Sequence, residues 1–143
     1  EDFSQLRNGP LADSQLEAGK YTNYTGTGAA IGDAVHYLIN SSDSRDNAVK
    51  ALVLMSDGAA NRPSGNGPGY ARQMAAYAAA NDVKIYTISL GNDADLGLMQ
   101  DIADISGGEH FDATGAGVNE LTERLTDAFT QAAAAIKRAT LVK

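Results

Sequence analysis

The 143-residue sequence contains no cysteine and no long apolar run. The absence of cysteine excludes disulfide bonds, zinc sites built on thiolates and a cysteine nucleophile. Since no stretch of about 18 apolar residues occurs, we expect no membrane-spanning segment. Basic residues are scarce, because 11 Lys and Arg stand against 18 Asp and Glu and leave a formal charge of -7. Nucleic-acid binding needs a basic surface, so we expect no nucleic-acid partner, and the charge favours cation binding instead.

The remaining composition is that of an ordinary globular chain. Hydrophobic residues make up 43% and charged residues 20%, and the length suits one domain. The chain starts at Glu1 rather than at methionine, so we expect a processed product or a fragment of a longer protein.

Helical and strand-like patterns alternate along the chain. Apolar residues recur at helical spacing in residues 27–40, from position 68 or 69, around 98–105 and in 121–136, and strand-like runs occupy 51–55, 83–90 and 109–113. Tyr70, Met74, Tyr77 and Ala78 mark the expected buried stripe of the second helix, and Gly107-Gly108 supplies a left-handed cap to the third. This order predicts right-handed βαβ crossovers and an open, mostly parallel α/β sheet flanked by helices. Segment 1–24 stays unassigned, which leaves residues 25–143 as the folded domain.

The run ALVLM at residues 51–55 points to the first candidate site. It is typical of a central strand buried on both faces, and it ends abruptly in Ser56, Asp57 and Gly58. Ligands of open parallel sheets bind beyond the carboxyl ends of the strands. Asp57 is therefore placed to bind a hard cation such as Mg²⁺ through oxygen. Because Asp-Gly is also a common turn pair, a purely structural turn is the alternative.

A second group of candidate site residues lies in YTNYTGTGAAIGDAV, residues 21–35. Thr25 and Thr27 precede the first predicted helix, where a hydroxyl caps the helix or reaches a metal across the sheet. The glycine spacing is similar to a dinucleotide fingerprint, but no apolar strand comes before it, which argues against nucleotide binding. Asp93 and Asp95 follow the strand at 83–90. They either line the same end of the sheet as Asp57 or favour a helix N-terminus as solvated acids.

The sequence offers little support for catalysis. No serine lies in a G-x-S-x-G context, and neither His36 nor His110 has an obvious Ser and Asp companion. We therefore expect no enzyme activity. A phosphoacceptor of response-regulator type is the least favoured hypothesis, because it needs an acidic pair after an earlier strand and residues 1–24 contain no such strand.

Five blocks of the sequence are, in order along the chain, TGTGAAIGDAV, ALVLMSDG, VKIYTISLG, LMQDIADISGGEHFDAT and the closing LTERLTDAFTQAAAAIKRATLVK. Together they resemble the later part of a von Willebrand factor type A domain. The resemblance covers residues 25–143. Its last two blocks look most like bacterial members, including those attached to tight-adherence pilus assembly. It implies a Rossmann-like sheet, an extracytoplasmic location and a protein partner.

The resemblance also implies a metal-ion-dependent adhesion site. In the family a divalent cation, usually Mg²⁺, lies at the top of the sheet, and an acidic group of the partner completes its coordination. The family aspartate matches Asp57 and the family threonine lies near Thr27, although an ungapped match puts Ala29 at that position. The family's Asp-x-Ser-x-Ser cluster is absent, so the site is incomplete in this chain. The loops that would contact the partner contain Thr25, Gly58 and Asn61.

In the family, the strand that matches residues 51–55 lies against a first strand that this sequence lacks. An exposed apolar edge recruits other chains. We therefore expect the chain to be the C-terminal part of a longer protein, or a second chain to cover the edge of 51–55. The leading hypothesis is an adhesion or assembly module. The alternative is a structural subunit of a surface assembly or filament with a degenerate metal site.

Overall fold

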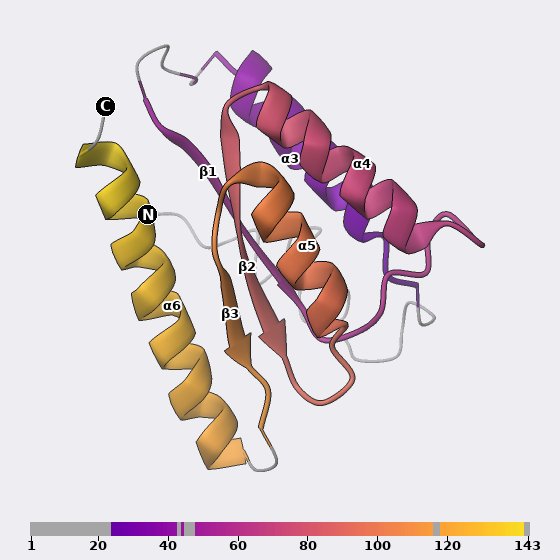
Figure 1. Cartoon of the computed structure of the whole chain (residues 1–143), viewed down its shortest axis with the longest axis vertical. Coiled ribbons are helices and arrows are strands. Elements are labelled where there is room, and N and C mark those ends of the chain that lie inside the picture. Colours follow the sequence, from indigo (N-terminus) through magenta and orange to yellow (C-terminus); the bar gives the residue numbers. More distant parts are fainter. Residues whose placement is uncertain (1–23, 43, 45–47, 116–117, 142–143) are drawn as a thin grey trace, which may run out of the picture.

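The computed structural model describes residues 24–42, 44, 48–115 and 118–141, which form an α/β fold (Figure 1). In chain order the elements are α3 (Thr27–Asn40), β1 (Lys50–Ser56), α4 (Gly67–Ala80), β2 (Val83–Leu90), α5 (Leu96–Ser106), β3 (His110–Ala113) and α6 (Val118–Leu141). The strands form one parallel sheet in the order β1-β2-β3. The open parallel sheet flanked by helices, predicted from the sequence, is confirmed. The unassigned segment 1–24 lies outside the described residues except for Tyr24.

Helices cover the sheet on both faces (Figure 1). On one face α3, α4 and α5 pack against β1 and β2 around Ile31, Val35, Ala75, Val83, Ile85, Met99 and Ile102. On the other face α6 packs through Ala128, Ala132 and Ala135 against Tyr86, Ile88 and Phe111. The crossover helices α4 and α5 share a face because the chain moves in one direction, from β1 to β2 to β3, and crossovers keep one hand.

The buried stripe of α4 differs from the prediction. Ala71, Ala75 and Ala78 are fully buried, whereas Tyr70 and Met74 are half-buried and Tyr77 is exposed. Helix α4 lies between α3 and α5, and its contact with α3 is close: a Cβ added at Gly28 would lie 2.5 Å from the Tyr70 ring. Small residues permit this approach, so the larger side chains of α4 occupy its flanks.

The prediction that residues 51–55 are buried on both faces is wrong for one face. Leu52 and Leu54 pack into the core beneath α3 and α4, but Val53 is 39% and Met55 46% exposed. The reason is the position of α6, which packs mainly on β2 and β3 and reaches β1 only at Ala51, so that Val53 and Met55 on the same face lie beyond its cover among the described residues. Phe129 lies within residues 121–136, where the sequence predicts an apolar helix face, but it is 47% exposed.

The turn between α5 and β3 ties the third helix to the central strand. Gly107 has φ of 73° and forms the predicted left-handed cap of α5. The buried Ser106 hydroxyl accepts a hydrogen bond from the Ile85 N–H at 2.9 Å. At Gly108 the two backbones touch, because an added Cβ would lie only 1.9 Å from the Ile85 carbonyl oxygen. The turn therefore leaves no room for a side chain beside β2.

Gly108→Ala tests this close approach. We expect it to lower the free energy of unfolding by about 2 kcal/mol, because a methyl group forced against backbone must displace either the turn or β2. Gly97→Ala in α5 is the matched control. Its Cβ would meet nothing closer than 3.7 Å, so alanine should preserve or raise stability there. Urea denaturation measures both variants, and equal stability of the two would contradict the packing described here.

Candidate functional site

Asp57 follows β1 directly, at the carboxyl end of the sheet. The turn that carries it is closed by Ser56, whose hydroxyl donates to the Gly58 carbonyl at 3.0 Å. Asp57 itself is exposed, and no hydrogen bond or ion pair joins its carboxylate to another described residue. The Asp-Gly turn is therefore held by its neighbour, which leaves the Asp57 oxygens available to a ligand.

Two loops are joined at this end of the sheet. The Thr25 N–H donates to the Asn61 side-chain oxygen at 2.8 Å, and the N–H groups of Asn61 and Arg62 donate to the Thr25 carbonyl at 3.0 and 3.2 Å. The Arg62 guanidinium lies over the Tyr24 ring, 3.6 Å from its centroid. A Cβ added at Gly58 would lie 3.8 Å from the Thr25 hydroxyl. The structure thus brings together the three residues predicted to contact a partner, and we call Thr25, Gly58, Asn61 and Arg62 the loop clamp.

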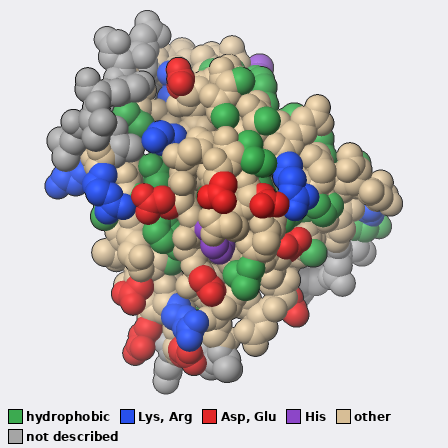
Figure 2. Space-filling view, in the orientation of Figure 1, with side chains coloured by type: hydrophobic (Ala, Val, Ile, Leu, Met, Phe, Trp, Pro, Cys, Tyr) green, Lys and Arg blue, Asp and Glu red, His purple; other side chains and the backbone are tan. Residues whose placement is uncertain are grey.

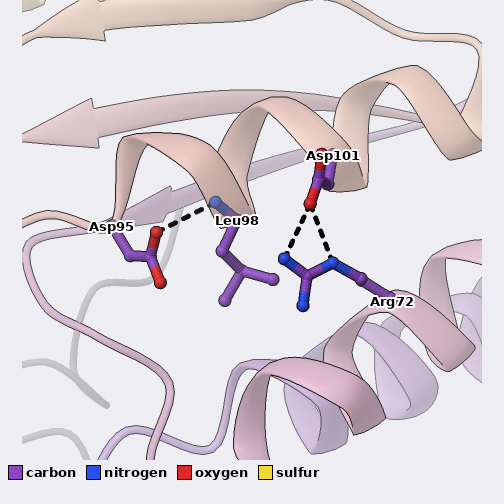
Figure 3. A network of polar contacts seen from close by, with 4 residues as sticks. All are labelled: Arg72, Asp95, Leu98 and Asp101. Atoms are coloured by element: carbon purple, nitrogen blue, oxygen red, sulfur yellow. Dashed lines mark hydrogen bonds and ion pairs between the residues drawn. The ribbon is translucent and has the colours of Figure 1, made fainter.

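Thr27, the second predicted metal ligand, is the first residue of α3 and is buried at 5% exposure. The N-cap of α3 is Gly26, and no side chain caps this helix within the described part of the chain. Neither Thr25 nor Thr27 is thus a helix cap. Asp95 does cap a helix, because its carboxylate accepts from the Leu98 N–H at 3.0 Å at the start of α5 (Figure 3).

A row of polar side chains crosses the carboxyl ends of the three strands. Ser56, Ser89 and Asp112 are neighbours in the strand register. Ser89 is fully buried, and its hydroxyl is the single buried side-chain polar atom without a partner among the described residues. Asp112 accepts from the Thr114 N–H at 2.8 Å, and hydrogen bonding by Thr114 lowers the pKa of Asp112. Sequence reasoning missed Ser89, because a lone serine inside an apolar strand forms no pattern.

The described residues fit only part of a magnesium site. Mg²⁺ takes about six oxygen ligands in near-octahedral geometry and keeps several waters. Asp57 offers a free carboxylate, and Thr27 offers a hydroxyl at the same end of the sheet. Within the described residues, no group of three or more His, Asp or Glu side chains is arranged to hold a metal ion. These residues therefore fit a cation whose shell is completed by water or by another polypeptide.

His110 lies on β3, away from Asp57. The Thr87 hydroxyl donates to the Met99 carbonyl at 2.9 Å and lies 3.0 Å from His110 Nδ1. Because the hydroxyl has one proton, Nδ1–H of the neutral imidazole must be the donor to Thr87. Burial lowers the pKa of His110, and the nearby carboxylates of Asp112 and Asp104 oppose this shift. His110 thus links β2, α5 and β3 in its neutral form.

A family model for the von Willebrand factor type A domain matches residues 4–128. This range is well over half of the sequence. The chain belongs to the von Willebrand factor type A domain family. Its members typically mediate protein–protein interactions. No curated protein and no solved structure matches the chain.

The membership confirms the resemblance at the level of the family. The matched range begins inside segment 1–24, of which the structure describes Tyr24 alone. None of the helices in the described part of the chain has the length and apolar character needed to span a bilayer. The loop clamp and Asp57 lie together at the carboxyl end of this von Willebrand type A sheet.

The pKa of His110 predicts how stability depends on pH. Its folded-state pKa lies below the ordinary value of 6.5, so the unfolded chain binds the proton more tightly. The free energy of unfolding should consequently decrease as the pH falls from about 7.5 to about 5.5. In His110→Asn this decrease should be smaller, since the residue no longer titrates. Denaturant titrations across this range measure the effect, and the same slope in both proteins would show that His110 does not contribute.

Proposed function

We propose that this von Willebrand type A domain is a binding module for adhesion or assembly that captures a protein partner at the carboxyl end of its sheet. The observation that carries the proposal is the loop clamp beside an unpartnered Asp57 carboxylate. The clamp is held by three hydrogen bonds that converge on Thr25, so its surface is ordered before a partner arrives. An ordered surface loses less conformational entropy on binding than a flexible one.

The capture site includes a divalent cation, for which Mg²⁺ fits the oxygen chemistry of Asp57 and Thr27. When bound, the cation supplies positive charge through which an acidic group of the partner is recognised. The chain's own part is to hold the carboxylate of Asp57 in the turn closed by Ser56 and to present the Asn61 and Arg62 loop beside it. The domain has no catalytic role in this proposal. It acts outside the cytoplasm, in the periplasm, at the cell surface or as a secreted protein, and the resemblance to bacterial tight-adherence proteins supports pilus assembly as its setting.

The second part of the proposal is that another polypeptide strand covers β1. The two edges of the described sheet differ. β3 is four residues long and carries His110 and Asp112, whereas β1 has seven residues and its only charged side chain is Lys50 at its start. Short, charged edges prevent strand addition, and long apolar ones invite it. The exposure of Val53 and Met55 beside this edge also supports the alternative function, a structural subunit in which packing matters and the metal site is degenerate.

Asp57→Asn tests the metal-dependent part. We expect Mg²⁺ to raise the melting temperature of the unmodified protein, because a ligand that binds only the folded state stabilises it. At a ligand concentration of 100 times the Kd, the free energy of unfolding rises by about 2.7 kcal/mol. Asp57→Asn should lose this response. Asp93→Asn is the matched control, since it removes an exposed carboxylate from the loop after β2 and should keep the response. A Mg²⁺ response that persists in Asp57→Asn would contradict the assignment of Asp57 as a ligand, and the absence of a response from the unmodified protein would favour the structural alternative.

Native mass spectrometry of the purified natural protein, with and without chelator, tests the covering of β1. We expect a second chain or additional covalent sequence, which supplies the strand that pairs with β1. Val53→Lys combined with Met55→Lys should weaken association with a second chain, because charges on an edge strand oppose strand addition. Tyr77→Lys, also exposed but distant on α4, is the control. A monomer of this chain alone, unchanged by the β1 substitutions, would contradict the proposal.

A further inference from the structure

A cavity of about 650 Å³ lies at the opposite end of the sheet from Asp57, where the strands begin. Small-molecule sites typically have volumes of about 300–1,000 Å³. The first half of β2 lines it with Lys84 and Tyr86, the turn after α5 with Gly107 and Gly108, and the last turns of α6 with Arg138. Neither Asp57 nor the loop clamp borders this cavity, so the proposed function does not use it.

Tyr86 provides the cavity with an unused hydrogen-bonding group. Its side chain is buried to all but 3%, in the layer between the sheet and α6. Its hydroxyl makes no hydrogen bond to any described residue, although it borders the cavity. Burial raises the pKa of Tyr86, and the neighbouring Glu109 carboxylate raises it further, so the phenol is neutral near pH 7. The hydroxyl is open to the cavity, because it is not among the fully buried unpartnered atoms of the described residues, and a ligand in the cavity is able to bond with it.

The charges around the cavity favour a cationic ligand. Asp82, Asp104 and Glu109 contribute three carboxylates, against the two cations Lys84 and Arg138. Both α4 and α5 end at this side of the sheet, and the C-terminal end of a helix carries partial negative charge. In the view of Figure 2, acidic side chains are also spread over the middle of the molecular face. Carboxylates therefore outnumber cations around the cavity, as they do in the whole chain, which has a net charge of -7.

Arg138 shows what chemistry the cavity accepts. Its guanidinium Nη2 lies 3.2 Å from one Glu109 carboxylate oxygen and 3.4 Å from the other. Both side chains are more than half exposed, at 64% and 51%. Ion pairs with this exposure are weak, because water screens them and holding two long side chains in place costs entropy. A cation from outside the chain is thus able to replace Arg138 on Glu109.

We propose that this cavity binds an organic cation, an ammonium or guanidinium group that pairs with Glu109 in place of Arg138 and donates a hydrogen bond to the Tyr86 hydroxyl. Arg138 then acts as an internal competitor for the ligand. Loss of the Glu109 charge must weaken binding, whereas loss of the Arg138 charge must strengthen it. These opposite signs separate a specific site from general attraction to an acidic protein.

The experiment measures binding to the full chain by isothermal titration calorimetry at low salt. Spermidine represents a free polyamine, and a terminally blocked Ala-Lys-Ala tripeptide represents a cationic polypeptide. For the probe that binds, we expect Glu109→Gln to weaken binding at least about fivefold and Arg138→Gln to tighten it about threefold. Tyr86→Phe should weaken binding about threefold through loss of one hydrogen bond. Circular dichroism melts confirm that each variant is folded.

Asp101→Asn is the matched control. Asp101 is an exposed carboxylate on α5 that pairs with Arg72 at 2.7 Å outside the cavity (Figure 3), so its loss changes the net charge as Glu109→Gln does. We expect it to leave the affinity unchanged. Binding by spermidine alone assigns the site to free polyamines, and binding by the tripeptide alone assigns it to a polypeptide side chain. The proposal is overturned if neither probe binds, or if Asp101→Asn and Glu109→Gln weaken binding equally.

Discussion

The burial of β2 on both faces is the constraint on which the rest of this structure depends. A parallel strand in the middle of a sheet must be covered on both sides, and six of the eight residues of β2 are buried. Helices α4 and α5 provide the cover on one face and α6 on the other. The contact of Gly108 and Ser106 with Ile85 then sets how closely the turn after α5 approaches the strand. Both ends of the sheet take their shape from this arrangement.

At the carboxyl end, the loops that follow the strands form the candidate binding site. The clamp between Thr25 and Asn61 consists of hydrogen bonds from backbone and side-chain amide groups, which fix the two loops against each other. Asp57 lies beside it with an unused carboxylate. At the amino end, the helix termini and the last turns of α6 enclose a cavity around Tyr86 and Glu109. The two ends therefore offer different chemistry: an exposed oxygen ligand at one, and a partly enclosed acidic cavity at the other.

Helices cover the sheet unevenly, and the uncovered part is relevant to protein interaction. α6 lies over β2 and β3, so one face of β1 is left with exposed Val53 and Met55 in the described part of the chain. The opposite edge, β3, is short and carries His110 and Asp112. Protein–protein interaction is the typical role of von Willebrand type A domains. The apolar edge and the clamp are the two surfaces to which the proposed function assigns such interaction.

Local pattern was enough to determine the α/β class, the bounds of β2, the helix at Thr27–Asn40 and the left-handed cap at Gly107, because these depend on side-chain period and on glycine's backbone freedom. The position of Asp57 after an apolar strand likewise follows from parallel-sheet geometry. Tertiary structure alone decided that alanines rather than Tyr77 face the core, that Val53, Met55 and Phe129 are exposed, that Ser89 has no partner, and that Tyr86 borders a cavity with Glu109. These features depend on how closely helices approach one another and on which strands α6 covers, and such distances between remote segments leave no periodic trace in the sequence.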